Sequence, residues 1–342
     1  MKRIFMTALL LLVVAYGIPL VTMGITGGEN PQSGAPSQTL PGSIGQAQQV
    51  SGKTYDEKTT ITLLRGGETV TLTMKEYLAG VVAAEMPASF PMEALKAQAV
   101  AARTYTLYKL NAYEQGAAIP ESHKGAQLCD DPGHCKAYTP LPESGKKLWG
   151  ENSAKYEALI RDAVESTNGM IVTYDGQAIA AVFHAASSGH TEAALDVWGS
   201  NQPYLVSVES PGEEECPKYR GEITISAADF AQKFKAKHPE ALLEGDPAGW
   251  FKNSTRSQTG GIIHTYVGGV SVSGIELRTM LGLYSTNFRL KTTADSLTFT
   301  TTGYGHGVGM SQYGARELAE EGKTFEEILK WYYHGTEVTL KN

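Results

Sequence analysis

Residues 74–113 read MKEYLAGVVAAEMPASFPMEALKAQAVAARTYTLYKLNAY, and this stretch contributes most to the fold prediction. Apolar residues recur at helical spacing as far as Met86, and Pro87 ends that helix. Pro91 then favours the first turn of a second helix, which we expect over residues 91–113. Because the second helix is rich in alanine, we expect it to pack closely against its neighbours, deep inside a domain.

Outside this stretch, strand and helix patterns mix without a regular strand–helix–strand alternation. Residues 59–73 alternate apolar and polar side chains around Gly66 and Gly67, which predicts a hairpin, and a second hairpin is expected to turn at Asp175 and Gly176. Further strands are predicted at 204–210, 221–226, 262–274 and 297–303, and further helices at 154–169, 227–238, 274–283 and 315–334. The pattern favours an α+β fold of mixed helices and antiparallel strands with a central cleft.

The beginning of the chain predicts a compartment. Lys2 and Arg3 precede residues 4–25, which carry no charge and are long enough to span a bilayer as a helix. We expect an uncleaved membrane anchor over residues 1–26, with a cleaved signal peptide as the alternative. Residues 27–55 are rich in Gly, Pro, Ser and Gln and predict a flexible linker, so the folded domain is expected at 56–342, outside the cytoplasm.

Length and charge limit the classes of function. The 342 residues suffice for one large domain or two ordinary ones, and 42% of them are hydrophobic, which suits a full core. The formal net charge of −7 argues against nucleic acid as the partner, because a basic surface normally carries that affinity. It does not exclude neutral polymers such as glycans.

A single carboxylate, Glu85, stands among small and apolar residues just before Met86 and Pro87. Such surroundings disfavour the charged form and raise the pKa of a carboxyl group, so Glu85 is a candidate general acid. Lys96 and Arg103 are seven positions apart and lie on one face of the following helix. They are either a solvated stripe or donors that face the same cleft as Glu85.

Two later segments combine glycine with polar and aromatic residues. Residues 183–205 contain hydroxyl, imidazole and aromatic side chains that suit sugar binding, namely His184, Ser187, Ser188, His190, Trp198 and Tyr204. A Ser–His nucleophile pair or a plain connection are the alternatives. Residues 301–321 have glycine at 303, 305, 307 and 309, with His306, Gln312 and Tyr313 alongside. This segment is either a binding loop or a close crossing of two backbones.

Residues 123–135, HKGAQLCDDPGHC, contain four residues of the types that bind zinc: His123, Cys129, His134 and Cys135. Two thiolates and two imidazoles satisfy tetrahedral zinc, and four protein ligands make such a site structural rather than catalytic. The alternatives are a disulfide between Cys129 and Cys135 and a loop without any bond. Cys216 stands apart and is expected to be free.

Taken together, AAEMPASFPMEALKAQAVAARTY, FHAASSGHTEAALDVWGSNQPYL, GIELRTMLGLYSTNF and GYGHGVGMSQYGA resemble the stage II sporulation protein D (SpoIID) family of endospore-forming bacteria. The resemblance runs from about residue 60 to 340 with the four motifs in the order of the family, and the anchor and linker suit its layout. It implies a lytic transglycosylase that cleaves the β-1,4 bond between N-acetylmuramic acid (MurNAc) and N-acetylglucosamine (GlcNAc) in peptide-stripped peptidoglycan during engulfment, leaving 1,6-anhydroMurNAc ends.

The resemblance also implies roles for individual residues. Glu85 in AAEMP is the catalytic acid, and Lys96 and Arg103 match positions tied to activity. The family's second motif places four residues in the cleft, and our prediction of substrate-binding residues adds three from the fourth motif: His184, Ser187, Ser188, Tyr204, His306, Gln312 and Tyr313. Some members bind zinc through His and Cys in the matching loop, so we expect a structural zinc and no organic cofactor.

A lytic transglycosylase explains how one acid suffices. Ordinary glycosidases use two carboxylates, whereas here the C6 hydroxyl of the sugar attacks in place of water, and its tethering replaces much of the second group's task. Glu85 would protonate the leaving oxygen and then take the proton from O6. The alternatives are a peptidoglycan-binding scaffold without activity and a zinc-dependent cell-wall amidase or peptidase, which needs an open metal position.

The family likewise implies partners and a location. We expect the protein to be single-pass in the mother-cell engulfing membrane, with its catalytic region outside the cytoplasm. The expected partners, besides glycan strands, are a membrane-anchored cell-wall amidase and endopeptidase and a polytopic membrane protein. The amidase would remove stem peptides and so create the bare strands that this enzyme cleaves.

Overall fold

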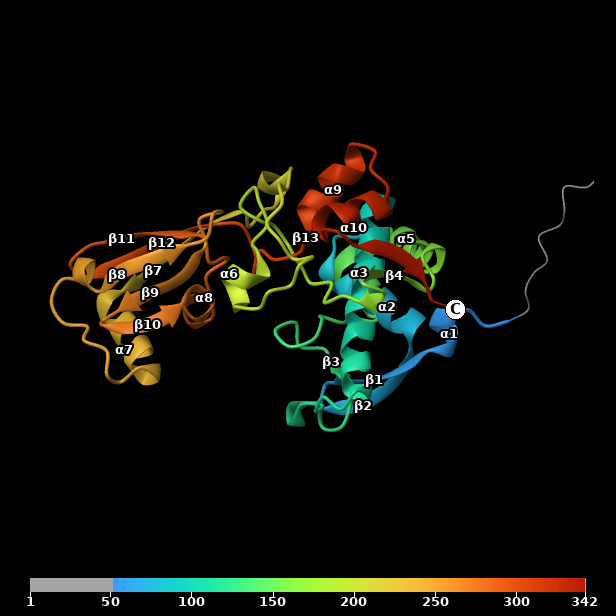
Figure 1. Ribbon diagram of the computed structural model, residues 1–342, viewed down its shortest axis with the longest axis horizontal. Coiled ribbons are helices and arrows are strands. Elements are labelled where there is room, and N and C mark those ends of the chain that lie inside the picture. Colours follow the sequence, from blue (N-terminus) through green and yellow to red (C-terminus); the bar gives the residue numbers. More distant parts are fainter. Residues whose placement is uncertain (1–51, 342) are drawn as a thin grey trace, which may run out of the picture. The chain divides into compact units, whose positions relative to one another are not determined.

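The computed structural model describes residues 52–341, which fold as an α+β unit (Figure 1). The predicted anchor at 1–26 and most of the predicted linker at 27–55 lie outside these residues. Within 52–341, no helix has the length and apolar character needed to cross a membrane. The first element, α1 (Tyr55–Lys58), begins one residue before the predicted domain boundary at residue 56.

The predicted first hairpin is present. β1 (Thr60–Arg65) and β2 (Glu68–Thr73) pair antiparallel, and Gly66 and Gly67 both have positive φ, as the tight turn requires. β3 (Leu128–Cys129) joins the other side of β1 in parallel. β2 leads directly into α2 (Met74–Glu85), where the Thr73 side chain accepts from the N–H of Glu76 in a capping box.

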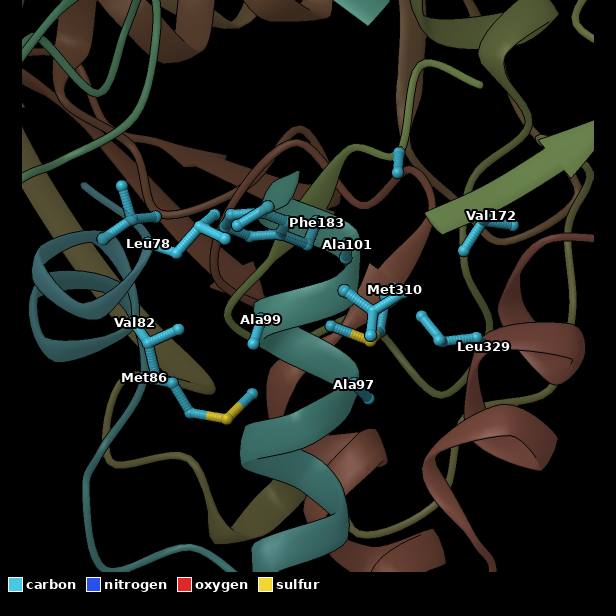
Figure 2. Packing of buried hydrophobic residues seen from close by; sticks show 14 of the residues in the cluster. Leu78, Val82, Met86, Ala97, Ala99, Ala101, Val172, Phe183, Met310 and Leu329 are labelled. Carbon is cyan, nitrogen blue, oxygen red and sulfur yellow. The ribbon is translucent and has the colours of Figure 1, made fainter. Parts of the chain in front are cut away.

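The two predicted central helices form the first hydrophobic core. α2 ends at Glu85, before Pro87, and α3 (Met92–Glu114) begins after Pro91. Figure 2 shows Leu78, Val82 and Met86 on one side of α3 and Met310 and Leu329 on the other. Because α3 presents small residues, Ala97, Ala99 and Ala101 among them, neighbouring elements approach its backbone closely.

Several elements pack around α3 in this first core. They are α5 (Ser153–Ser166), the sheet of β14 (Glu337–Leu340), β4 (Met170–Tyr174) and β5 (Gln177–Ala178), the parallel pair β6 (Phe183–His184) and β13 (Met310–Ser311), and the helices α9 (Gln312–Glu320) and α10 (Phe325–Tyr332). The turn between β4 and β5 lies at Asp175 and Gly176, as predicted. The helix predicted at 315–334 is interrupted near Gly322, where φ is positive, and forms α9 and α10.

Residues 220–302 form a second hydrophobic core of their own. One sheet has the order β11 (Phe288–Thr292), β12 (Ser296–Thr302), β7 (Arg220–Ser226), and the other the order β10 (Val270–Ser273), β9 (Ile262–Val267), β8 (Phe251–Arg256). α7 (Ala227–Lys237) and α8 (Gly274–Leu281) complete this region. This segment lies between β6 and β13 in the sequence, and both of those strands belong to the first core. It is therefore an insertion into the sequence that builds the first core.

One predicted strand is wrong. Residues 204–210 form no strand, and only a single bridge joins His190 to Glu209. The N–H of Thr191 donates to the carbonyl of Val208, and the Thr191 hydroxyl accepts from the N–H of Val208 and donates to the carbonyl of Val206, so a side chain completes what is only a short piece of ladder. The remaining short elements are α4 (Leu141–Ser144), α6 (Ala194–Trp198), single 3-10 turns at Glu121–His123, Gly150–Asn152, Glu213–Glu215 and Pro247–Gly249, and a π turn at Gly145–Trp149.

Candidate functional site

Glu85 is the last residue of α2 and is half-buried. Its Oε1 accepts a hydrogen bond of 2.9 Å from the backbone N–H of Ala137. Burial raises the pKa of the Glu85 carboxyl, while the charge of Lys136 and the hydrogen bond from Ala137 act in the opposite direction. The negative end of the helix dipole also disfavours a carboxylate at this position. The net effect raises the pKa of Glu85, the direction that a general acid requires.

Lys136 is the cation that acts on Glu85, and sequence reasoning missed it. Its side chain is buried, with Nζ 3.6 Å from the ring centre of Phe183 and 4.4 Å from that of Tyr105. Burial lowers the pKa of Lys136 to about 8, although the nearby Glu85 carboxyl raises it. The one sequence feature that could have pointed to Lys136 is its position directly after the predicted metal ligand Cys135. The ring faces stabilise the ammonium group in place of water.

His184 and His306 lie together with Trp198. The ring centre of His306 lies 5.6 Å from the ring centre of His184 and 5.3 Å from that of Trp198. The Trp198 side chain is 42% exposed. His184 Nδ1 lies 3.1 Å from the carbonyl oxygen of Val308, and its buried Nε2 has no hydrogen-bond partner within residues 52–341. Burial lowers the pKa of His184 to about 4 and that of His306 well below its ordinary value. Both rings are therefore neutral near pH 7.

The alternating glycines bring the second and fourth motifs together. Gly303, Gly305, Gly307 and Gly309 all have positive φ. A Cβ at Gly305 would lie 2.7 Å from Cβ of His184, and one at Gly309 would lie 2.2 Å from the carbonyl oxygen of Val182. Any larger residue would therefore push these two segments apart. The predicted close crossing of backbones is thus present, beside His306.

One predicted hydroxyl residue, Ser187, bonds inside the protein. The hydroxyls of Ser187 and Ser311 donate to the two oxygens of Glu213, at 2.7 and 2.9 Å, and all three residues are buried. Burial raises the pKa of the Glu213 carboxyl, against the lowering effect of its serine donors. Ser188 is partly exposed and lies 3.4 Å from the carbonyl oxygen of Thr259. Ser188, rather than Ser187, is therefore free to face a ligand.

The prediction that Arg103 faces the cleft with Glu85 needs correction. Arg103 is fully buried, and its guanidinium forms an ion pair with Asp56, with Nη2 2.7 Å from Oδ2. It donates further bonds to the backbone carbonyls of Met170 and Val164. All of these partners belong to the core, so Arg103 links α1, α3 and the β4 region and does not meet a substrate.

Tyr204 also lies in the core rather than at a surface. It is 6% exposed, its hydroxyl accepts from the N–H of Ala180, and its ring packs on Tyr174. The expectation that it lines a cleft is therefore corrected as well. Nζ of Lys96 lies 2.8 Å from Oε1 of Glu93. Oε2 of Glu93 accepts a hydrogen bond from the N–H of Phe325 at the start of α10.

Gln312 and Tyr313 open α9, next to α3. The amide of Gln312 donates to the side-chain oxygen of Gln98 at 3.2 Å, and both residues are buried. Tyr313 packs edge-on against Phe90 and is partly exposed. Of the predicted residues, Ser188 and His306 line one pocket and the buried His184 packs on His306, while Gln312 serves packing.

The four predicted metal ligands converge. The ligand atoms of His123, Cys129, His134 and Cys135 all lie within 4.8 Å of one another. The Cys129 and Cys135 sulfurs are 3.5 and 3.8 Å from Nδ1 of His134, and the three cysteines of the described chain are unbonded. These separations suit a tetrahedron with ligand bonds of about 2.0–2.3 Å. Nδ1 of His123 lies 3.2 Å from the carbonyl oxygen of Ala126, which directs Nε2 to the cluster.

The cluster connects directly to the Glu85 environment. Cys135 is followed by Lys136, whose charge acts on Glu85, and by Ala137, whose N–H donates to the Glu85 carboxyl. Lys109 from α3 approaches the same loop, with Nζ 3.2 Å from Sγ of Cys135 and 3.0 Å from the carbonyl oxygen of His134. A group bound by the four ligands would therefore fix the loop that completes the carboxyl's surroundings.

Comparisons with known proteins identify the family. A sequence model described as stage II sporulation protein matches residues 66–174. Stage II sporulation protein D of Bacillus subtilis (strain 168) is 43% identical over 267 residues, which cover 78% of this chain and 74% of that protein. The protein of the same name from Bacillus amyloliquefaciens is 40% identical with the same coverage, and a Bacillus subtilis protein named amidase enhancer is 29% identical over 77% of this chain and 40% of its own length. This chain belongs to the stage II sporulation protein D family.

Proposed function

We propose that this protein is a peptidoglycan lytic transglycosylase that acts in sporulation, with Glu85 as general acid and then base. Its substrate would be peptide-stripped glycan strands, cleaved at the MurNAc–GlcNAc β-1,4 bond to 1,6-anhydroMurNAc ends. The observation that carries the proposal is the half-buried Glu85 carboxyl, whose pKa is raised by desolvation, in a chain of this family. A role in sporulation is supported by the family assignment and by the names of the two Bacillus relatives.

The first chemical step would be proton transfer. Glu85 would donate its proton to the glycosidic oxygen as the bond to C1 of MurNAc breaks, which leaves a carboxylate beside an oxocarbenium-like sugar. The hydrogen bond from the N–H of Ala137 and the charge of Lys136 would stabilise that carboxylate as it forms. The Ala137 N–H and the Lys136 charge, which lower the pKa of Glu85 in the resting protein, would therefore favour the transfer of its proton.

The second step would close the ring. The Glu85 carboxylate would take the proton from O6 while O6 bonds to C1, so the acid returns to its starting form and no water is consumed. The nucleophile belongs to the substrate, so the step needs no second catalytic carboxyl. Trp198 and Ser188 would face the strand: the exposed ring stacks on sugar CH groups, and the hydroxyl forms hydrogen bonds.

We propose that His123, Cys129, His134 and Cys135 bind a structural zinc ion. The donor set of two imidazoles and two thiols, with the ligand atoms within 4.8 Å of one another, supports this metal. Bound zinc would tie the loop together without offering an open position for chemistry. A zinc amidase is therefore not favoured by this donor set.

We further propose that the protein is anchored by residues 1–26, with its catalytic region outside the cytoplasm, and that it works beside a cell-wall amidase. The relative named amidase enhancer supports a connection between this family and such enzymes. An amidase that strips stem peptides would supply the bare strands. The membrane-anchored amidase and endopeptidase and the polytopic membrane partner both remain proposals that rest on the family resemblance.

Digestion of peptide-free glycan strands tests the proposed reaction. The protein is incubated with the strands, and the products are analysed by mass spectrometry. Products that end in 1,6-anhydroMurNAc are expected. Products heavier by one water would mean a hydrolase, and binding of the strands without cleavage would mean a scaffold.

A further inference from the structure

Two cations lie without a carboxylate partner where the insertion of residues 220–302 leaves and rejoins the first core. Arg278, on α8, is partly exposed, and its Nε donates to the carbonyl of Tyr284 at 3.2 Å. Lys218 is exposed, and its Nζ lies 3.5 Å from the hydroxyl oxygen of Tyr304. Within residues 52–341, neither cation takes part in an ion pair.

The charge of Arg278 is uncompensated. Burial lowers the pKa of its guanidinium group, and the opposing effect comes from the neighbouring Tyr304 rather than from a carboxylate. A partly buried charge without a counter-charge costs free energy, which an anionic ligand would recover. Because Lys218 lies beside the same tyrosine, and Tyr304 is itself partly exposed, an anion can reach both cations from solvent.

Two tyrosines hold these cations in place. The ring centres of Tyr284 and Tyr304 are 5.4 Å apart, and Nζ of Lys218 lies 5.8 Å from the first centre and 5.0 Å from the second. The ring faces stabilise the ammonium group. The carbonyl of Tyr284 accepts from the N–H of Gly305 as well as from Arg278, so the backbone orients the guanidinium. Both charges therefore have a defined position, as a binding site requires.

Arg278 belongs to the same neighbourhood as Glu85. The charges of Arg278 and of Lys136 both lower the pKa of His306, and Lys136 is the cation that acts on Glu85. The exposed ring of Trp198 packs on His306, so this neighbourhood opens to solvent. A glycan strand is a polymer of repeating rings, so a strand cleaved at Glu85 extends over the surface beside it. Arg278 lies on that surface.

The proposed substrate supplies an anion of the right kind. A peptide-stripped strand carries a free lactyl carboxylate on each MurNAc, whereas an unstripped strand has an amide bond at the same atom. A guanidinium group binds a carboxylate through two parallel hydrogen bonds, and it gains nothing comparable from an amide. The protein has a formal net charge of −7, so local cations are needed to hold a strand that is itself negative.

We propose that Arg278, assisted by Lys218, binds a lactyl carboxylate of the strand and so recognises strands from which the stem peptide has been removed. The proposal rests on the proposed function and deepens it, because it assigns the selection of peptide-stripped strands to two side chains. Arg278 would form a paired hydrogen bond with the carboxylate, and Lys218 would add a point charge. An intact stem peptide would present a neutral amide and leave Arg278 unpaired.

Binding of two matched oligomers tests this recognition apart from catalysis. The first probe is a tetramer of alternating GlcNAc and MurNAc with free lactyl carboxylates, and the second is the same tetramer with each carboxylate converted to a methylamide. Both are titrated by calorimetry into Glu85→Gln protein, which avoids turnover. The test variants add Arg278→Gln or Lys218→Gln to this protein. The control adds Arg289→Gln, which removes an exposed cation of the same insertion. Thermal unfolding shows whether each protein is folded.

We expect Glu85→Gln protein to bind the free-acid tetramer about tenfold more tightly than the methylamide tetramer. Arg278→Gln should abolish this preference, Lys218→Gln should reduce it by about threefold, and Arg289→Gln should leave it unchanged. Lys218 is exposed, so Lys218→Gln decides the result if Arg278→Gln does not fold. Equal binding of the two tetramers by Glu85→Gln protein would overturn the proposal, as would a preference that survives in both test variants.

A third probe and the cleavage assay separate the remaining outcomes. If a tetramer that retains its stem peptides binds as tightly as the free-acid tetramer and depends on Arg278, the recognised carboxylate belongs to the peptide and the proposal fails. If wild-type protein cleaves strands but shows no preference between the tetramers, the activity stands and the recognition fails. If wild-type protein does not cleave strands but the preference depends on Arg278, the recognition stands and the transglycosylase assignment fails.

Discussion

Arg103 and Asp56 form a buried ion pair across 47 residues of sequence. Nε of Arg103 lies 3.0 Å from Oδ1 of Asp56 and Nη2 lies 2.7 Å from Oδ2, with the two side chains 0% and 2% exposed. The pair joins the first helix of the described chain to the long central helix α3. Because the remaining Arg103 donors reach backbone carbonyls, the pair is fully hydrogen-bonded, as a buried pair must be.

We predict that breaking this pair costs stability rather than substrate affinity. Arg103→Met leaves the Asp56 carboxylate buried and uncompensated, and its expected cost is about 3–5 kcal/mol of the free energy of unfolding. Urea unfolding measures this cost, with Arg161→Met as the control because the Arg161 side chain is 51% exposed. If Arg103→Met unfolds like the wild type yet fails to bind glycan strands, Arg103 is a substrate residue after all.

We predict that loss of the proposed zinc ion weakens both the fold and the Glu85 site. Cys135→Ser removes one of the four ligands, and Cys135 is two residues from the N–H that donates to Glu85. The expected results are loss of bound zinc, an unfolding temperature lower by several degrees and reduced cleavage. Metal analysis and calorimetry check this, with Cys216→Ser as the control, since Cys216 lies outside the cluster. Full zinc content in Cys135→Ser would contradict the ligand assignment.

The pH dependence of cleavage is expected to report the protonation of Glu85. Because the acid form is required, activity falls as pH rises through the raised pKa of this carboxyl. The charge of Lys136 lowers that pKa, so Lys136→Met is expected to raise it and to move the alkaline limb of kcat to higher pH. Lys155→Met, at an exposed position, serves as the control. A limb that stays in place or moves to lower pH would contradict the assigned coupling.

Glu85 is also expected to reduce stability at neutral and alkaline pH. The folded state raises the pKa of this carboxyl, so it binds the proton more tightly than the unfolded state, and stability falls as pH rises from the ordinary carboxyl range through the raised pKa. Glu85→Gln removes this cost and is predicted to unfold at a higher temperature than wild type above the raised pKa. The difference should vanish in acid. A Glu85→Gln protein less stable than wild type at pH 8 would contradict this account.

The sequence predicted local features well and tertiary pairings poorly. Pro87 and Pro91 located the ends of α2 and α3 because proline acts on its own neighbours, and Gly66 and Gly67 located a turn for the same reason. The four predicted metal ligands lie within thirteen residues, so their convergence could be predicted. Residues 204–210 read as a strand, but they pair with the chain near His190 at a single bridge, to which the Thr191 hydroxyl adds two bonds.

The partners of the buried charges could not be predicted. Arg103 and Glu85 both lie among apolar residues. Arg103 forms an ion pair with Asp56, whereas Glu85 feels only the charge of Lys136, and spacing along the helix cannot distinguish these outcomes. Glu213 lies 26 and 98 residues from the two serines that donate to it. The third motif of the sequence contains Arg278, but its lack of a carboxylate partner is a property of the folded chain alone.

The central claim is that Glu85 drives cleavage without water, and cleavage in water enriched in ¹⁸O tests it most directly. Wild-type protein, Glu85→Gln and the exposed control Glu114→Gln are each incubated with peptide-free strands, and the new ends are analysed by mass spectrometry. We predict unlabelled 1,6-anhydroMurNAc ends from wild type and control, and no cleavage by Glu85→Gln. New ends that carry one ¹⁸O atom, or unimpaired cleavage by Glu85→Gln, would contradict the account.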